Sequence, residues 1–129
     1  MATASRKPTK KNLPPVKTGR VYVQSTFNNT IISVTDSTGG VLSWASAGSQ
    51  GFKGARKSTP YAAQVAMKTA VDKAKGRGLE SVDVYVSGVG SGREQAVRWL
   101  GNSGLMVGTI QDVTPVAHNG ARAKKPRRV

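Results

Sequence analysis

Glycines and cations alternate in one short segment of this chain, residues 47–58, between an expected strand and an expected helix. Glycine lets a backbone approach a phosphate closely, and lysine or arginine supplies the matching charge. Gly51 precedes Lys57 at the spacing of a P-loop, but Arg56 occupies the place of the second required glycine. Three interpretations stay open: nucleotide hydrolysis, a surface loop with incidental cations, and contact of Lys53, Arg56 and Lys57 with an RNA phosphate backbone, which we favour.

A second glycine-rich segment, residues 88–93, also follows an expected strand and opens an expected helix. It resembles a dinucleotide fingerprint only superficially, because Arg93 stands where the third glycine would be. Two interpretations remain, a phosphate cradle charged by Arg93 and a tight turn with a good cap. Ser91 and Glu94 stand three residues apart, which predicts a reciprocal capping box at the start of the helix.

Metal-dependent and acid-base chemistry find little support among the titratable residues. The chain has one histidine, His118, and no cysteine, so a zinc site has too few ligands. The six acids are scattered over different elements, whereas a two-metal nuclease needs several at one point. We therefore expect no catalytic residue, no metal and no cofactor, and we expect His118 to contact a base or a phosphate.

Positive charge is concentrated at both ends of the chain. Residues 1–20 carry six cations and residues 113–129 carry five, with no acid in either segment, so the ends hold +11 of the net +14. Such segments are predicted to stay mobile until a polyanion neutralises them, which makes nucleic acid the leading partner. The predicted organisation is a basic arm (1–20), one domain (21–112) and a basic tail (113–129). We expect a cytoplasmic protein without membrane contact or small-molecule substrate.

The periodicity of apolar residues predicts an α/β fold with a mixed β-sheet, in the order β-β-β-α-β-α-β. Asn28-Asn29 is expected to make a two-residue turn with positive φ between the first two strands. Trp44 and Trp99 are expected in the core rather than as stacking platforms. The expected strands are 21–27, 30–35, 41–45, 81–86 and 105–110, and the expected helices begin at Pro60 and after Ser91 and end by Gly76 and Gly104.

Four sequence blocks, found in the same order, resemble the universal small-subunit ribosomal protein eleven family in its bacterial form. They are Phe27 to Thr30, Gly51 to Ala63, Gly88 to Glu94, and Asp112 to Pro115 with His118-Asn119-Gly120 and the Arg-Arg-Val end. The resemblance implies a ribonuclease H-like fold without catalytic carboxylates, and a non-enzymatic protein that binds small-subunit rRNA in the platform. It also implies that the tail threads rRNA near the mRNA exit and the Shine-Dalgarno duplex, beside neighbouring platform proteins. By position, the rRNA-contacting residues would be Lys53, Arg56, Lys57, Arg93, His118, Asn119, Arg122, Lys124, Lys125, Arg127 and Arg128.

The chain departs from the family at Val89 and Ser91, where family members commonly have prolines. These changes leave the charge of the loop unaltered, so they bear on how ordered the loop is before binding and not on RNA as its binding partner. Two rival functions are a small nucleotide hydrolase that uses both glycine segments and a DNA-compacting or duplex-binding protein. Asn119-Gly120 also has the small following residue that lets an asparagine side chain cyclise, which makes isoaspartate formation in the tail a chemical hypothesis.

Overall fold

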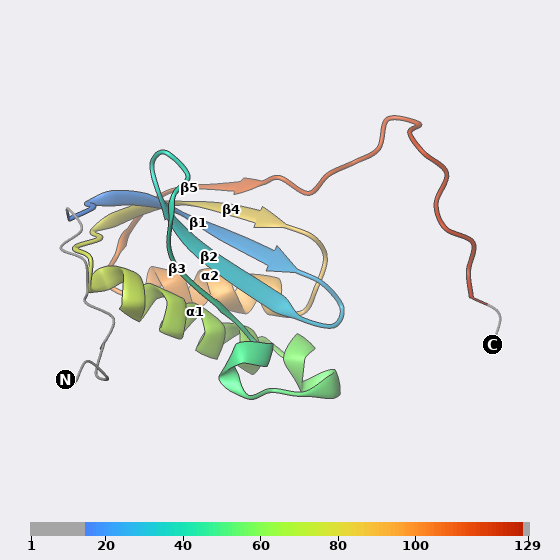
Figure 1. Ribbon diagram of the computed structural model, residues 1–129, viewed down its shortest axis with the longest axis horizontal. Coiled ribbons are helices and arrows are strands. Elements are labelled where there is room, and N and C mark those ends of the chain that lie inside the picture. The colour runs from blue at the N-terminus through green and yellow to red at the C-terminus, as the bar shows by residue number, and fades with distance from the viewer. Residues whose placement is uncertain (1–14, 128–129) are drawn as a thin grey trace, which may run out of the picture.

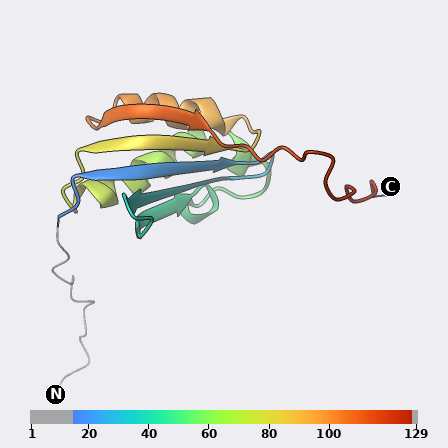
Figure 2. The same cartoon turned by 90° about the horizontal axis from the view of Figure 1, so that it is seen from above.

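The computed structural model describes residues 15–127, in which two helices cover one face of a five-stranded sheet (Figures 1 and 2). The strands lie in the order β3-β2-β1-β4-β5. β1, β2 and β3 pair antiparallel, whereas β4 is parallel to β1 and to β5, so the predicted mixed sheet is confirmed. Within residues 15–127, the observed order differs from the predicted one only by two 3-10 helices between β3 and α1. The elements are β1 (Thr18–Ser25), β2 (Thr30–Asp36), β3 (Val41–Ser46), η2 (Gly48–Gln50), η3 (Gly54–Ser58), α1 (Pro60–Lys75), β4 (Ser81–Ser87), α2 (Gly92–Gly101) and β5 (Met106–Asp112).

Alternating aliphatic residues decide which face of the sheet is buried. Successive strand side chains point to opposite faces, so a residue at every second position packs against the helices. Val21 pairs in register with Val34 of β2 and with Val84 of β4, and all three are 0% exposed. The core therefore lies between this face and the two helices.

The helix α1 begins and ends where local sequence signals predict. The Thr59 hydroxyl accepts a hydrogen bond from the Ala62 amide at 3.3 Å, and Pro60 occupies the first turn, where its missing N–H costs nothing. The residues that face the sheet are mostly alanines, which lets the helix lie close to it. They are Ala62, Ala63, Ala66, Met67, Ala70, Val71 and Ala74, all buried.

The first hairpin differs from the prediction in its start and in its turn. β1 begins at Thr18 rather than Val21, because Thr18 already pairs with Ser81 of β4. The turn uses the Thr26 side chain, whose Oγ1 accepts from the Asn29 amide at 3.0 Å. Among the described residues, Asn119 is the one non-glycine with positive φ, so the positive φ predicted for Asn28-Asn29 is wrong.

Two predicted side-chain roles are also wrong. Ser91 makes no capping hydrogen bond to α2, because its hydroxyl donates to the carbonyl oxygen of Ser58 in the neighbouring loop. The capping box with Glu94 is therefore not formed. Trp44 is 57% exposed on the face of the sheet away from the helices, whereas Trp99 packs partly buried against the core as expected.

Within residues 15–127, neither helix has both the length and the apolar character needed to cross a bilayer.

Candidate nucleic-acid interface

The loops predicted to bind phosphate meet at one end of the sheet. The parallel strands β1, β4 and β5 all finish there, and β3 runs the same way because it is antiparallel to β2. Each helix follows a strand that ends at this point, so both helix N-termini lie at this end as well (Figure 1). We call it the loop end of the sheet.

The first glycine segment is folded into two short 3-10 helices rather than into a phosphate-wrapping loop. Gly51 and Gly54 take positive φ, +91° and +58°, whereas Arg56 lies inside η3 and does not. The carbonyl oxygen of Arg56 accepts from the amide and from the hydroxyl of Thr59, which ties η3 to the start of α1. Lys53 and Arg56 are exposed and Lys57 is half-buried, so these cations stand on a fixed backbone.

An aromatic pair anchors the same segment. Phe52 packs edge-on against Tyr61 of α1, with ring centroids 5.9 Å apart. Such edge-to-face pairs add about 0.5–1.5 kcal/mol beyond the area they bury. Phe52 thus packs against α1 from within the glycine segment.

The glycines of the second segment make close packing possible. A Cβ added at Gly88 would lie 2.0 Å from the Ser25 carbonyl oxygen, and one at Gly90 would lie 2.5 Å from that of Thr26. At Gly92 the added atom would meet the Cβ of Ala63 at 2.6 Å. No side chain fits these positions, so the tight-turn interpretation is sufficient for the three glycines. The segment is wedged against the first hairpin and α1.

Arg93 fixes the origin of the tail. Its Nη1 donates to the Gly88 carbonyl oxygen at 3.0 Å, and its Nη2 pairs with Asp112 Oδ2 at 2.5 Å. Asp112 Oδ1 accepts from the amide and the hydroxyl of Thr114, and the Gly88 amide donates to that hydroxyl at 3.1 Å. Hydrogen bonds from Thr114 and Arg93 hold the pKa of Asp112 well below its usual range. Arg93 is thus engaged inside the protein as well as placed at the loop end.

The remaining predicted contacts lie in the tail and are not brought together with the loop end. After Thr114 every described residue is exposed, and the chain runs away from the sheet (Figure 1). His118 belongs to no cluster of three or more potential metal ligands, because no such cluster occurs in the described part of the chain. Arg128 lies outside the described residues. The exposed predicted contacts are His118, Asn119, Arg122, Lys124, Lys125 and Arg127.

A comparison with a family profile identifies the protein family of this chain. The profile described as ribosomal protein S11 matches residues 19–128, which is most of the chain. The chain belongs to the ribosomal protein S11 family. The family inferred from the four sequence blocks is therefore confirmed. The family is a structural, non-enzymatic one of the small ribosomal subunit, whose members bind rRNA and other ribosomal proteins as part of the ribosome.

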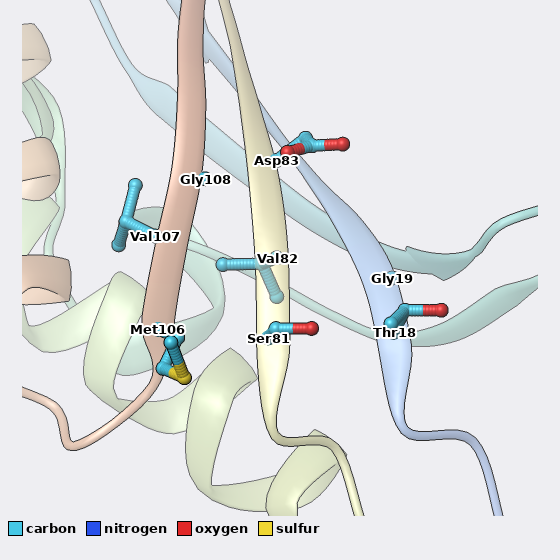
Figure 3. Close-up of a pocket in the computed structure, with 8 residues that line it drawn as sticks. All are labelled: Thr18, Gly19, Ser81, Val82, Asp83, Met106, Val107 and Gly108. Atoms are coloured by element: carbon cyan, nitrogen blue, oxygen red, sulfur yellow. The ribbon is translucent and has the colours of Figure 1, made fainter.

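The pocket in Figure 3 is not part of this interface. It has a volume of about 330 Å³ and lies between β1, β4 and β5 at the strand starts, opposite the loop end. The pairing of β4 with β5 shifts between Val82 and Val84, and a Cβ at Gly108 would lie 2.6 Å from Asp83 Oδ1. Asp83 Oδ1 already accepts from the Thr109 amide at 3.2 Å. The hollow is thus a consequence of the irregular pairing.

One residue at the loop end was missed by the sequence reasoning. Phe27 is 78% exposed at the tip of the first hairpin, close in sequence to the Thr26 carbonyl that Gly90 packs against. An aromatic residue inside a turn between two strands is the signal that could have identified it. Its ring is exposed at the same end of the sheet as the loop-end cations.

Proposed function

We propose that this member of the family binds small-subunit rRNA with the loop end of the sheet and with the tail that leaves from it. One observation carries the proposal: Lys53, Arg56 and Lys57 stand at the same end of the sheet as Arg93 and the origin of the tail. Both helix N-termini lie there too, and the helix dipoles favour anions. Phosphates of a folded RNA fit this combination of charge and geometry.

The binding free energy comes mainly from phosphate neutralisation. Each cation that contacts a phosphate releases condensed counterions, and the whole chain carries a net charge of +14. The cations of the loop end stand on an ordered backbone, so their side chains lose conformational freedom on binding but their backbone does not. The proposed contacts are Lys53, Arg56, Lys57, Arg93, His118, Asn119, Arg122, Lys124, Lys125, Arg127 and Arg128.

We further propose the finer location that the family resemblance implies. The domain of residues 21–112 binds in the platform of the small subunit of a cytoplasmic ribosome, between a basic arm (1–20) and a basic tail (113–129). The tail reaches rRNA near the mRNA exit and the Shine-Dalgarno duplex, beside neighbouring platform proteins. The mixed sheet with helices on one face is compatible with a ribonuclease H-like fold.

Salt-dependent binding of the full chain to deproteinised small-subunit rRNA tests the loop end. The double variant Lys53→Ala, Lys57→Ala is compared with Lys68→Ala, Lys73→Ala, which removes two exposed cations from α1. In a filter-binding titration, the first pair should lower the slope of log K against log salt by about 1.5, and the second should leave it unchanged. Equal slopes for the two double variants would overturn the proposal for the loop end.

A cross-linking experiment tests the proposed location of the tail. A photoreactive amino acid in place of Val116, which is 75% exposed, is carried into small-subunit particles by the tagged protein. Cross-links near the 3′ end of the small-subunit rRNA are expected. Cross-links confined to other regions, or a protein that fails to sediment with small-subunit particles, would contradict the location.

A further inference from the structure

The face of the sheet that the helices leave open carries a row of aromatic and small polar residues. No helix among residues 15–127 covers this face, which Figure 2 presents toward the viewer. The strand register places Trp44 opposite Ser33, Ser33 opposite Tyr22, and Tyr22 opposite Tyr85. Tyr85 in turn pairs with Gln111 of the edge strand β5. The row thus crosses all five strands and is separate from the loop end.

The strand positions of this row leave room for an inserted flat group. Tyr22 and Tyr85 are stacked, with centroids 5.2 Å apart and planes 18° from parallel. Because Tyr85 covers one face of Tyr22, the other face of that ring is turned toward Ser33. Trp44 lies two strands away from Tyr22, at a backbone separation of about 10 Å. A flat ring stacked on both sides needs about 7 Å between its neighbours, and the small side chain of Ser33 leaves that space open.

We propose that one unpaired base of the rRNA inserts over Ser33, stacked between Tyr22 and Trp44. Sequence-specific RNA recognition uses unpaired bases splayed onto aromatic side chains, and open sheet faces with exposed rings are one of the surfaces that do this. The half-buried Ser33 hydroxyl lies below the base edge as a hydrogen-bonding group. The inference rests on the rRNA binding of the family and not on the contacts proposed for the loop end.

Charge and polarity on this face fit RNA better than an apolar protein segment. The Arg20 guanidinium lies 5.9 Å from the centroid of Tyr85, and its Nη1 is 3.4 Å from the Tyr22 hydroxyl. It therefore places a positive charge beside the rings, where a nucleotide phosphate would lie. The side chains that flank the row are mostly polar, whereas the core of a stable protein interface is enriched in apolar area. They are Gln24, Ser46 and Ser87, with the apolar Ile31, 39% exposed, between Gln24 and Ser46.

Affinity of the full chain for deproteinised small-subunit rRNA, measured by filter binding, tests the inserted base. Trp44→Ala removes one stacking surface, and Ser33→Leu fills the space between the rings. Each should weaken binding about tenfold and leave the salt slope unchanged, because stacking on one base involves no counterion release. Val41→Ala removes an exposed apolar side chain from the same strand outside the row and should bind as the wild type does. Wild-type affinity in both Trp44→Ala and Ser33→Leu would overturn the proposal.

Tryptophan emission gives a direct reading of the same contact. In a Trp99→Phe background Trp44 is the remaining tryptophan, and its emission should be quenched when the rRNA is added. Unchanged emission would overturn the proposal. So would variants that bind naked rRNA normally but fail to join small-subunit particles, because the face would then fit a neighbouring protein. A normal salt slope in Lys53→Ala, Lys57→Ala together with weak binding by Trp44→Ala would overturn the loop-end contacts and leave the inserted base standing.

Discussion

The loop end of the sheet and the tail both carry cations, but they hold them in opposite ways. At the loop end, Gly88 and Gly90 are wedged against the first hairpin, and η3 is tied to α1 through Thr59. In the tail, every described residue after Thr114 is exposed. In the proposed complex, the loop end would therefore present its charges from an ordered backbone, whereas the tail would become ordered on the RNA at a cost in conformational entropy.

The two regions are joined by a defined origin. Arg93 pairs with Asp112, and Thr114 bonds both to that carboxylate and to the Gly88 amide. This network fixes the direction in which the tail leaves the sheet while leaving the residues beyond it exposed. In the proposed complex, a fixed origin would reduce the volume that the tail explores and so raise the effective concentration of its cations near RNA bound at the loop end.

Gly88→Ala should give the largest effect, a loss of stability of the folded domain. The added Cβ would lie 2.0 Å from a backbone oxygen at a φ of +87°, so overpacking and backbone strain together should lower the free energy of unfolding by about 3 kcal/mol. Denaturant unfolding measures the loss. Gly101→Ala is the control, because an added Cβ there meets nothing within 4 Å. An equal stability of the two variants would refute the tight packing of this segment.

Lys124→Ala, Lys125→Ala should change RNA binding without changing stability. Both side chains are exposed in the tail, so the unfolding midpoint should stay within error of the wild type. The slope of log K against log salt for rRNA should fall by about 1.5. A double variant that shifts the unfolding midpoint but not the salt slope would contradict the proposal that the tail binds RNA without contributing to stability.

Asp112→Asn should change the pH dependence of stability, because Asp112 links the loop end to the start of the tail. The pKa of Asp112 is lowered in the folded state by hydrogen bonds from Thr114 and Arg93, so its ionised form stabilises folding above the unfolded pKa of about 3.9. That contribution is lost as pH falls through the folded-state value. The stability difference between wild type and Asp112→Asn should therefore be largest near neutral pH and should shrink as the solution is acidified below about pH 4.

Asp36→Asn serves as the comparison for that experiment. The hydroxyl of Thr38 and the amide of Gly40 lower the pKa of Asp36, far from the tail. This variant should show the same direction of pH dependence, but it should leave cross-linking from Val116 unchanged. Asp112→Asn should spread those cross-links over more sites, and an unaltered pattern would argue against a fixed origin.

Asn119 should show the smallest effect, a slow chemical change confined to the tail. It is exposed, takes a φ of +60°, and is followed by Gly120, so its side chain is accessible to attack by the next backbone nitrogen. A peptide map after long incubation of the free protein should find isoaspartate at Asn119 and none at Asn29, whose side-chain oxygen accepts from the Thr30 amide. Unmodified Asn119 throughout would count against the hypothesis.

Local sequence signals were sufficient to predict the helices and strands that depend on interactions between residues near in sequence. Thr59 and Pro60 start α1, and the alternation around Val84 makes a strand with one buried face, because capping and side-chain periodicity depend only on near neighbours. The family was also readable from the sequence, because four blocks of residues occur in one order. Lys53, Arg56, Lys57 and Arg93 were singled out because they stand among glycines, and the fold then placed these four cations at one end of the sheet.

Tertiary structure alone decided the features whose cause lies far along the chain. The Ser91 hydroxyl bonds to Ser58 and not to its own helix, because folding brings the two loops together. The glycines after β4 are required by Ser25, Thr26 and Ala63, which no local pattern reveals. Trp44, Tyr22 and Tyr85 form one row only because the register of four strands aligns them. Sequence determines which side of each strand faces the core, but contacts between strands depend on their order in the sheet, and that order is fixed only when the whole core packs.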